Sequence, residues 1–214
     1  LDDVTISWNV FDTTAGTNGW GLVLGNVSDL TVEQNLFDQG ILMAIGGGGV
    51  TSENVNITSN TFNDFAGAGI QFVRDGSGSL GSSDEDNNLV QITQNVFNSR
   101  SVGVYFFATS DPLASPDDLA DSLQAANFGE EILFDENAFT NYAVGEVGMQ
   151  ISADDTSLPI TIDARNTFWD SPNGPTTAEN LYNVGAQGAP LVNNGEATVF
   201  FQPWWDVLTN DTPG

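Results

Sequence analysis

The sequence predicts an all-β protein whose strands are stacked in successive coils. Three observations lead to this prediction: a short motif recurs along the chain, apolar and polar residues alternate within each copy, and strand follows strand without an intervening helix. Self-similarity of this kind indicates units that bury their apolar faces only against their neighbours. Because equivalent strands of successive units can lie parallel only if the chain winds as a solenoid, we expect one rod-like stack.

The recurring motif is a short strand that ends in Asn, any residue and Phe. The first and third residues of each copy are apolar, which is the period of a strand with one buried face. The asparagines are 26, 25, 35, 42 and 29 residues apart, so the shortest steps indicate a basic coil near 25 residues with insertions elsewhere. The six copies span residues 4–11, 30–37, 55–62, 90–97, 132–139 and 160–168, the last with one extra residue.

A second strand is expected after each Phe, usually opened by Gly. These segments again carry apolar residues at alternate positions, as expected of strands that are buried on one face. They span residues 21–24, 41–45, 69–72, 103–106 and 148–151.

The chain resembles the right-handed parallel β-helix of the pectin-lyase-like superfamily, and the resemblance covers nearly its whole length. The Asn-x-Phe repeat carries it, together with a tail that runs from Asn166 through Trp169 and Pro175 to Pro203 and Trp204. The resemblance implies a single domain over residues 1–214, with about six to seven coils and a closing coil and cap at residues 166–214. It implies no particular activity, because this fold carries lyases, hydrolases, adhesins and surface proteins.

Coils that stack about 4.8 Å apart would place the repeated side chains in columns. Each Asn amide can then donate to the next one, and the Phe rings can stack, as side chains do in other stacked-strand arrays. Asn also tolerates the left-handed backbone that a sharp bend needs. We therefore expect a structural ladder made of Asn9, Asn35, Asn60, Asn95, Asn137, Asn166, Phe11, Phe37, Phe62, Phe97, Phe139 and Phe168.

The charge balance is strongly acidic, with 29 acidic residues, three arginines, no histidine and a formal net charge of −26. Salt shortens the range of such self-repulsion to about 3 Å at 1 M, so we expect a saline, halophilic setting at the cell surface or outside the cell. A nucleic-acid partner is excluded because it requires a basic footprint. No apolar run is long enough for membrane insertion.

The first copy opens directly on a strand, so we expect an uncovered end of the stack. Terminal repeats normally carry caps, because an open end exposes strand edges and apolar residues. A missing N-terminal region, consistent with a processed or excised start at Leu1, and a second subunit docked head to tail are both expected covers. A head-to-tail contact that does not close would build a filament.

Residues 74–89 form a predicted loop insertion rich in Gly, Ser and Asp. Within it, Asp84, Asp86 and Asn88 place oxygen ligands at alternate positions, as the start of a Ca²⁺ loop does. Leu89 stands where that pattern needs Gly, and no distal Glu follows. A calcium site and a merely solvated acidic loop both remain open, and no other cofactor is expected.

Residues 108–131 form a second predicted insertion, with the one short helix of the chain. Ser115 followed by Pro116 predicts its beginning, because Ser caps helices and Pro suits their first position. Leu119, Leu123 and Ala126 would then share one face.

The residues expected to point outward from the second strands are Val23, Leu42, Gln71, Tyr105 and Gln150, with Phe107 beyond. Of these, Leu42, Tyr105 and Phe107 are candidates for an interface or for a platform that binds glycans. Cover by the predicted helix is a further alternative.

No catalytic residue is assigned. A lyase of this superfamily is implied to use Arg or Lys, and an inverting hydrolase to use carboxylates about 6.5 to 9.5 Å apart. The chain has no Lys or His. Arg74 and Arg100 lie in successive coils, so a shared site is an alternative, but each is explained more simply by pairing with surrounding carboxylates. We therefore expect a structural protein or adhesin at the cell surface, with a head-to-tail fibre among its allowed arrangements. The alternative is a module that binds or cleaves carbohydrate.

Overall fold

The structure is a computed structural model. It describes residues 2–12, 20–25, 28–46, 51–63, 67–75, 79–80, 90–98, 101–109, 132–152, 161–178, 188–193 and 198–204.

The described residues form three sheets in which every strand pairing is parallel. Sheet 1 contains β1 (Asp2–Ser7), β4 (Ser28–Glu33), β7 (Thr51–Thr58), β11 (Val90–Thr93), β14 (Ile132–Leu133), β17 (Thr161–Asp163) and β20 (Thr198–Phe200), with β10 (Ser79–Leu80) beside β7. Sheet 2 contains β2 (Val10–Phe11), β5 (Leu36–Phe37), β8 (Thr61–Asn63), β12 (Val96–Asn98), β15 (Ala138–Thr140) and β18 (Phe168–Trp169). Sheet 3 contains β3 (Leu22–Gly25), β6 (Ile41–Gly46), β9 (Ala68–Asp75), β13 (Val102–Thr109), β16 (Val147–Ser152) and β19 (Leu191–Asn193).

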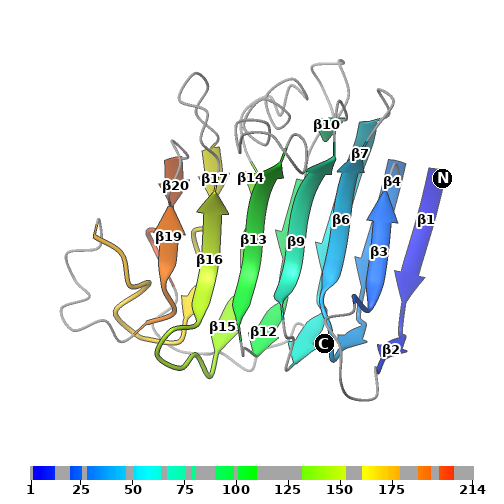
Figure 1. The fold of residues 1–214 in the computed structure, drawn as a ribbon. Helices are drawn as coiled ribbons and strands as arrows, with labels where there is room; N and C mark the ends of the chain where they lie inside the picture. Colours follow the sequence, from blue (N-terminus) through cyan, green and yellow to red (C-terminus); the bar gives the residue numbers. More distant parts are fainter. Residues whose placement is uncertain are drawn as a thin grey trace.

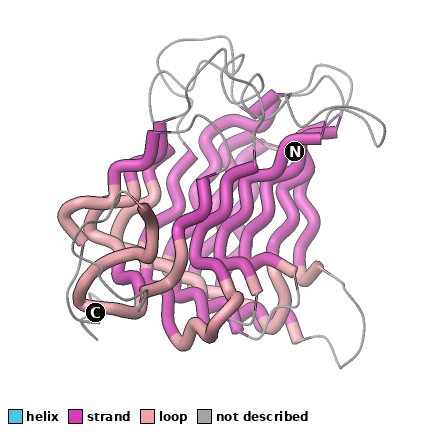
Figure 2. The backbone as a smooth tube through the Cα atoms, turned by 60° about the vertical axis from the view of Figure 1, so that its left-hand side comes forward, coloured by secondary structure: helices cyan, strands magenta, loops and turns pink. Residues whose placement is uncertain are grey.

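Apart from β10, consecutive strands join sheets 1, 2 and 3 in turn. We call each such set of three strands a coil, so that β1, β2 and β3 form the first coil and β17, β18 and β19 the sixth. Figure 1 shows the sheet 3 strands side by side in chain order, from β3 to β19. In Figure 2 the strands of successive coils lie next to one another along the molecule.

The prediction of an all-β chain with parallel strands is confirmed over the described residues. No helix occurs among them, and Figure 2 draws none. The predicted helix within residues 115–126 lies outside the described residues, as do most of the insertions at 74–89 and 108–131.

The register of sheet 1 places the repeated apolar residues over one another. Val4 pairs with Leu30, Leu30 with Val55 and Val55 with Val90. The alternate residues on these strands are buried from the second coil onward, including Val32 and Ile57. Period-two alternation therefore identifies the residues that fill the interior between the sheets.

Glycines near the start of the sheet 3 strands allow the coils to approach closely. A Cβ on Gly40 would lie 1.8 Å from the Ala68 carbonyl oxygen. A Cβ on Gly69 would lie 2.7 Å from the Gly103 oxygen, and one on Gly103 would lie 2.5 Å from the Gly148 oxygen. Since real Cβ contacts are not this short, the stacking of the coils requires Gly at this column.

Candidate functional site: the amide and ring files

Each coil turns sharply between its sheet 1 strand and its sheet 2 strand. One residue at the turn has left-handed backbone, with φ between 53° and 60°, which costs an L-residue about 1–2 kcal/mol. We expected the repeated Asn to serve the bend, but in the first five coils the residue before it does so. The residues with this conformation are Trp8, Gln34, Ser59, Gln94, Glu136 and Asn166.

Five of the repeated asparagines form a single file of hydrogen bonds, which we call the amide file. In each step, the Oδ1 atom of one Asn accepts hydrogen bonds of 2.9–3.1 Å from the Asn of the preceding coil, both from its backbone N–H and from its Nδ2. The file therefore has a direction: each Asn donates toward the C-terminal end of the stack. Its members are Asn9, Asn35, Asn60, Asn95 and Asn137.

The same amides also bind the coil before them. Asn35 Nδ2 donates to the Ile6 carbonyl at 2.8 Å, and Asn60 Nδ2 donates to the Val32 carbonyl at 2.8 Å. Equivalent bonds join Asn95 to Ile57 at 2.8 Å and Asn137 to Ile92 at 2.7 Å. From the second coil to the fifth these asparagines are buried. Each amide thus satisfies polar groups that cannot reach water, and losing it would be costly.

A second file, the ring file, lies two residues beyond each amide. Its Phe rings are stacked with centroids 4.5–5.3 Å apart, and Trp169 is tilted by 36° against Phe139 with centroids 4.8 Å apart, all within the usual range for aromatic pairs. Phe134 adds a ring beside Phe139, with centroids 5.7 Å apart. The ring file consists of Phe11, Phe37, Phe62, Phe97, Phe139 and Trp169.

The sixth copy of the repeat departs from the expected register by one residue. Ile162 pairs with Ile132, and Trp169 pairs with Phe139, so Thr167 stands opposite Asn137. We expected Asn166 and Phe168 in these files, and this is corrected: the extra residue in the sixth copy moves both of them one place away. The Thr167 hydroxyl donates to the Phe134 carbonyl at 3.2 Å, which repeats one bond of the amides it replaces.

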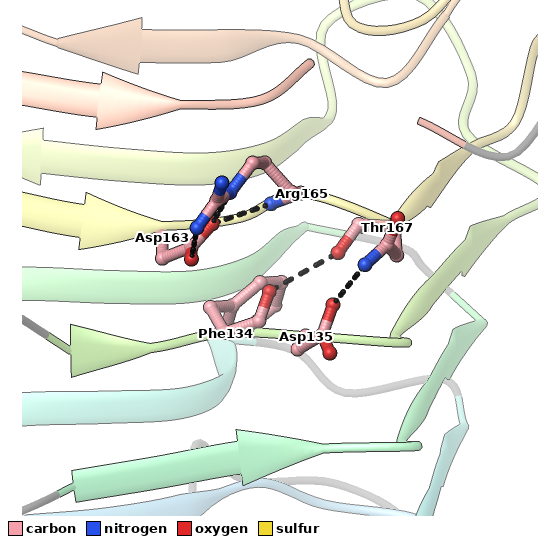
Figure 3. A network of polar contacts seen from close by, with 6 residues as sticks. Phe134, Asp135, Asp163, Arg165 and Thr167 are labelled. Atoms are coloured by element: carbon pink, nitrogen blue, oxygen red, sulfur yellow. Dashed lines mark hydrogen bonds and ion pairs between the residues drawn. The ribbon is translucent and has the colours of Figure 1, made fainter. Parts of the chain in front are cut away.

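A polar network lies where β14 and β17 end (Figure 3). Arg165 Nε donates to Asp163 Oδ1 at 2.6 Å, and Arg165 Nη2 contacts Asp163 Oδ2. Asp163 is buried, so this pairing compensates a carboxylate that would otherwise be costly to remove from water.

Asp135 is the neighbour of this pair. Asn166 Nδ2 donates to Asp135 Oδ1 at 3.0 Å, so Asn166 binds an adjacent carboxylate instead of joining the amide file. Burial raises the pKa of Asp135 above its ordinary value, and the charges of Glu136 and Asp163 add to this rise, while the bond from Asn166 opposes it. The network therefore favours a protonated Asp135 more than water does.

The outward positions of sheet 3 align from coil to coil. Val23 pairs with Leu42, Leu42 with Gln71, Gln71 with Tyr105 and Tyr105 with Gln150. The side chains of Gln71, Tyr105 and Gln150 are half-buried. Phe107 continues the register on β13, but its side chain and that of Leu42 lie outside the described residues.

The candidate calcium ligands Asp84, Asp86 and Asn88 lie outside the described residues. Among the residues that are described, no three His, Cys, Asp or Glu side chains are grouped so that they could hold a metal ion. In the same part of the chain, no helix has the length and apolar character needed to cross a membrane.

The two ends of the stack differ. At the first coil, the interior residues Val4, Ile6 and Phe11 are only partly buried, whereas their counterparts Leu30, Val32 and Phe37 in the second coil are fully buried. The exposed end is therefore an apolar face with open strand edges.

At the last coil, residues 198–204 lie against the sheet 1 strand and the corner. The Phe200 carbonyl accepts from Ala164 N–H at 2.7 Å, and the Pro203 carbonyl accepts from Asn166 N–H at 2.6 Å. Trp204 Nε1 donates to the Pro172 carbonyl at 3.0 Å. This segment covers the turn between β17 and β18, where Asn166 lies.

Sequence reasoning missed Thr167, Trp169 and Asp163 as members of these arrangements. The spacing of the apolar residues was the signal for Thr167 and Trp169. Ile162 and Ala164 occupy the buried positions only if the sixth copy begins at residue 162 and not at residue 160. For Asp163, its place two residues before Arg165 was the available signal. Comparisons with family models, with curated proteins and with solved structures find no match to this chain.

Proposed function

We propose that the chain is a right-handed parallel β-helix of the pectin-lyase-like superfamily and that its role is structural or adhesive. In this proposal residues 1–214 form one domain, with insertions at 74–89 and 108–131 and a closing coil and cap at 166–214. The observation that carries the proposal is the continuity of the amide and ring files across successive coils. The buried repeat residues contact each other along the stack, as they do in rods whose repeats contact only their neighbours.

The proposed location is the cell surface or the extracellular space of a saline environment. A formal net charge of −26 keeps such rods apart at low ionic strength and lets them approach when salt screens the charge. An apolar first face then supplies the adhesive end. No metal or other cofactor takes part in this role, although a calcium ion at residues 84–88 would be compatible with it.

Electron microscopy with sedimentation velocity in low and high salt tests this role. We expect straight rods that associate more as the salt concentration rises, because salt screens the repulsion between them while their apolar contacts persist. Compact particles that stay monomeric at all salt concentrations would contradict the proposal.

A glycan-binding or glycan-cleaving surface on sheet 3 is the second candidate. The observation that favours it is the row in which Tyr105 lies between Gln71 and Gln150. An aromatic ring beside amides suits a sugar ring, which offers both apolar and hydroxyl groups.

A glycan panel separates the two roles. Binding should be lost in Tyr105→Ala if the row on sheet 3 binds sugar. Gln91→Ala is the matched control, because Gln91 is a half-buried residue on β11 in the same coil but on sheet 1. Equal binding by both variants would rule out this surface, and release of shorter glycans would indicate cleavage.

A further inference from the structure

The first coil exposes residues whose counterparts are buried in the coils that have a neighbouring coil on each side. Phe11 is partly buried, whereas its counterparts Phe37 and Phe62 are fully buried. Asn9 is exposed, whereas Asn35 is 3% exposed. The first coil therefore has the composition of a middle coil, and an apolar face of this kind marks a docking surface.

The direction of the amide file specifies the polar groups that would fit this face. In the next steps of the file, Oδ1 accepts from the backbone N–H and the Nδ2 of the preceding Asn. Asn9 Oδ1 receives no such pair of donors from the described residues. The backbone N–H of Leu36 donates to the Asn9 carbonyl at 2.9 Å, and by the same register the N–H of Val10 points out of the open face. A complementary surface must therefore offer an Asn amide and, next to it, a free carbonyl.

The covered C-terminal end of a second copy does not offer these groups. Its position in the amide file is Thr167, which has no amide and whose hydroxyl already donates to Phe134. The corner of that end is covered by the bond from Asn166 N–H to Pro203 and by Trp204.

A second copy turned end over end fits no better. If a two-fold axis set β1 against β1 of a second copy, it would also set β2 against β3 of that copy. These two strands differ in length, with 2 and 4 residues. The corner with Asn9 would then face a different corner. Strands paired across such an axis would also be antiparallel, so the amide file would not continue.

We propose that the first coil is a docking site for one further parallel β-coil that carries Asn at its corner and an aromatic ring two residues later. This inference rests on the proposed β-helix and names the partner of its apolar end. In the docked state the Asn of the partner donates to Asn9 Oδ1, its carbonyl accepts from Val10 N–H, and its ring stacks on Phe11.

The chain supplies its own probe for this site. A copy of residues 30–54 is joined directly to Val4 in place of residues 1–3. Because Val55 follows residue 54 and shares the register of Leu30 and Val4, the new junction repeats a native one. Hydrogen exchange of residues 4–12 is then compared between the extended protein and the unmodified protein.

Exchange of the Val10 amide should slow by about tenfold or more in the extended protein, because the amide gains an acceptor and a buried setting. The matched control carries Asn35→Ala in the added copy alone and should lose most of this protection. Asn9→Ala provides a second readout: it should change the thermal midpoint little in the unmodified protein and clearly lower it in the extended one.

Unchanged exchange at Val10, or equal protection by the added copy with and without its Asn, would overturn the proposal. Sedimentation of the unmodified protein gives a further test, since stacks abolished by Val10→Arg would show that a second copy is the occupant. The outcome is independent of fibre formation, because an isolated extended rod gives the exchange result even if the protein never assembles.

Discussion

Removal of one buried amide from the middle of the file should destabilise the protein far more than removal of the exposed one at its start. Asn60 is 1% exposed and is bound on both sides, whereas Asn9 is exposed and bound on one side. The substitutions Asn60→Ala and Asn9→Ala delete the same atoms from the same position of the repeat. Their difference therefore measures the burial and pairing of the amide rather than its chemical identity.

The magnitude follows from the bonds that Asn60→Ala breaks. The Asn35 N–H and Nδ2 lose their acceptor, each from a bond of 3.0 Å, and the Val32 carbonyl loses a donor at 2.8 Å. A buried polar group left without a partner costs about 1–3 kcal/mol, and a water molecule in the vacated space would recover part of that. We expect about 3–5 kcal/mol for Asn60→Ala and about 0.5–1 kcal/mol for Asn9→Ala, where water replaces the amide.

Urea unfolding followed by circular dichroism at one fixed salt concentration measures both values. The slope with denaturant should be the same for the two variants and the original protein, which would show that the midpoints report stability. Hydrogen exchange at the third coil detects local opening if the coils do not unfold together. Equal losses at Asn9 and Asn60, or a loss below about 1 kcal/mol at Asn60, would refute the structural role of the amide file.

Three further measurements address other parts of the structure. Asp135→Asn should stabilise the protein at pH 7 by about half a kcal/mol or less, since the group is partly solvated. The pKa of Asp135 is raised in the folded protein, so ionisation of this carboxyl costs stability at pH 7. The gain from the substitution, measured by chemical unfolding, should therefore vanish as the pH falls to the ordinary pKa of 3.8. Gly40→Ala should cost several kcal/mol because its Cβ would meet the Ala68 carbonyl oxygen at 1.8 Å, whereas Gly67→Ala, with its nearest contact at 3.8 Å, should cost little in thermal unfolding. The thermal midpoint should rise with NaCl because the formal net charge is −26, and a midpoint that does not change with salt would contradict that account.

The parts of the fold that depend on alternation could be predicted from the sequence. Leu30 and Val32, and Val55 and Ile57, stand two residues apart with polar residues between them, and all four are fully buried. Because strand side chains alternate in direction, this spacing defines the interior face without any knowledge of the neighbouring strand.

The register of the sixth copy could not be predicted in the same way. Asn166 and Phe168 reproduce the motif, so the motif alone favours them over Thr167 and Trp169. What decides the register is which residues fill the interior, and Ile162 and Ala164 do so only in the observed alignment. Since a shift of one residue turns every side chain of a strand to the other face, burial outweighs the match to the motif.

The left-handed residues were hidden from sequence reasoning for a different reason. Trp8, Gln34, Ser59, Gln94 and Glu136 have little in common as side chains, although each adopts the same backbone conformation. Asn is the residue that tolerates this conformation best, but here its side chain is engaged in the amide file. The bonds of the following Asn offset the backbone cost of about 1–2 kcal/mol at the turn, so the turn position itself is free to vary.

A file that donates in one direction makes the two ends of the stack chemically different. At the far end Thr167 ends the series of amides, and the segment that contains Pro203 and Trp204 covers the corner. At the near end Asn9 retains an acceptor that matches any coil with an Asn at its corner. Charge cannot impose this choice of partner, because screened repulsion acts on both ends alike. Specificity at the open face must therefore come from the position of the amide. A partner without Asn at its corner would bury Asn9 Oδ1 without a donor.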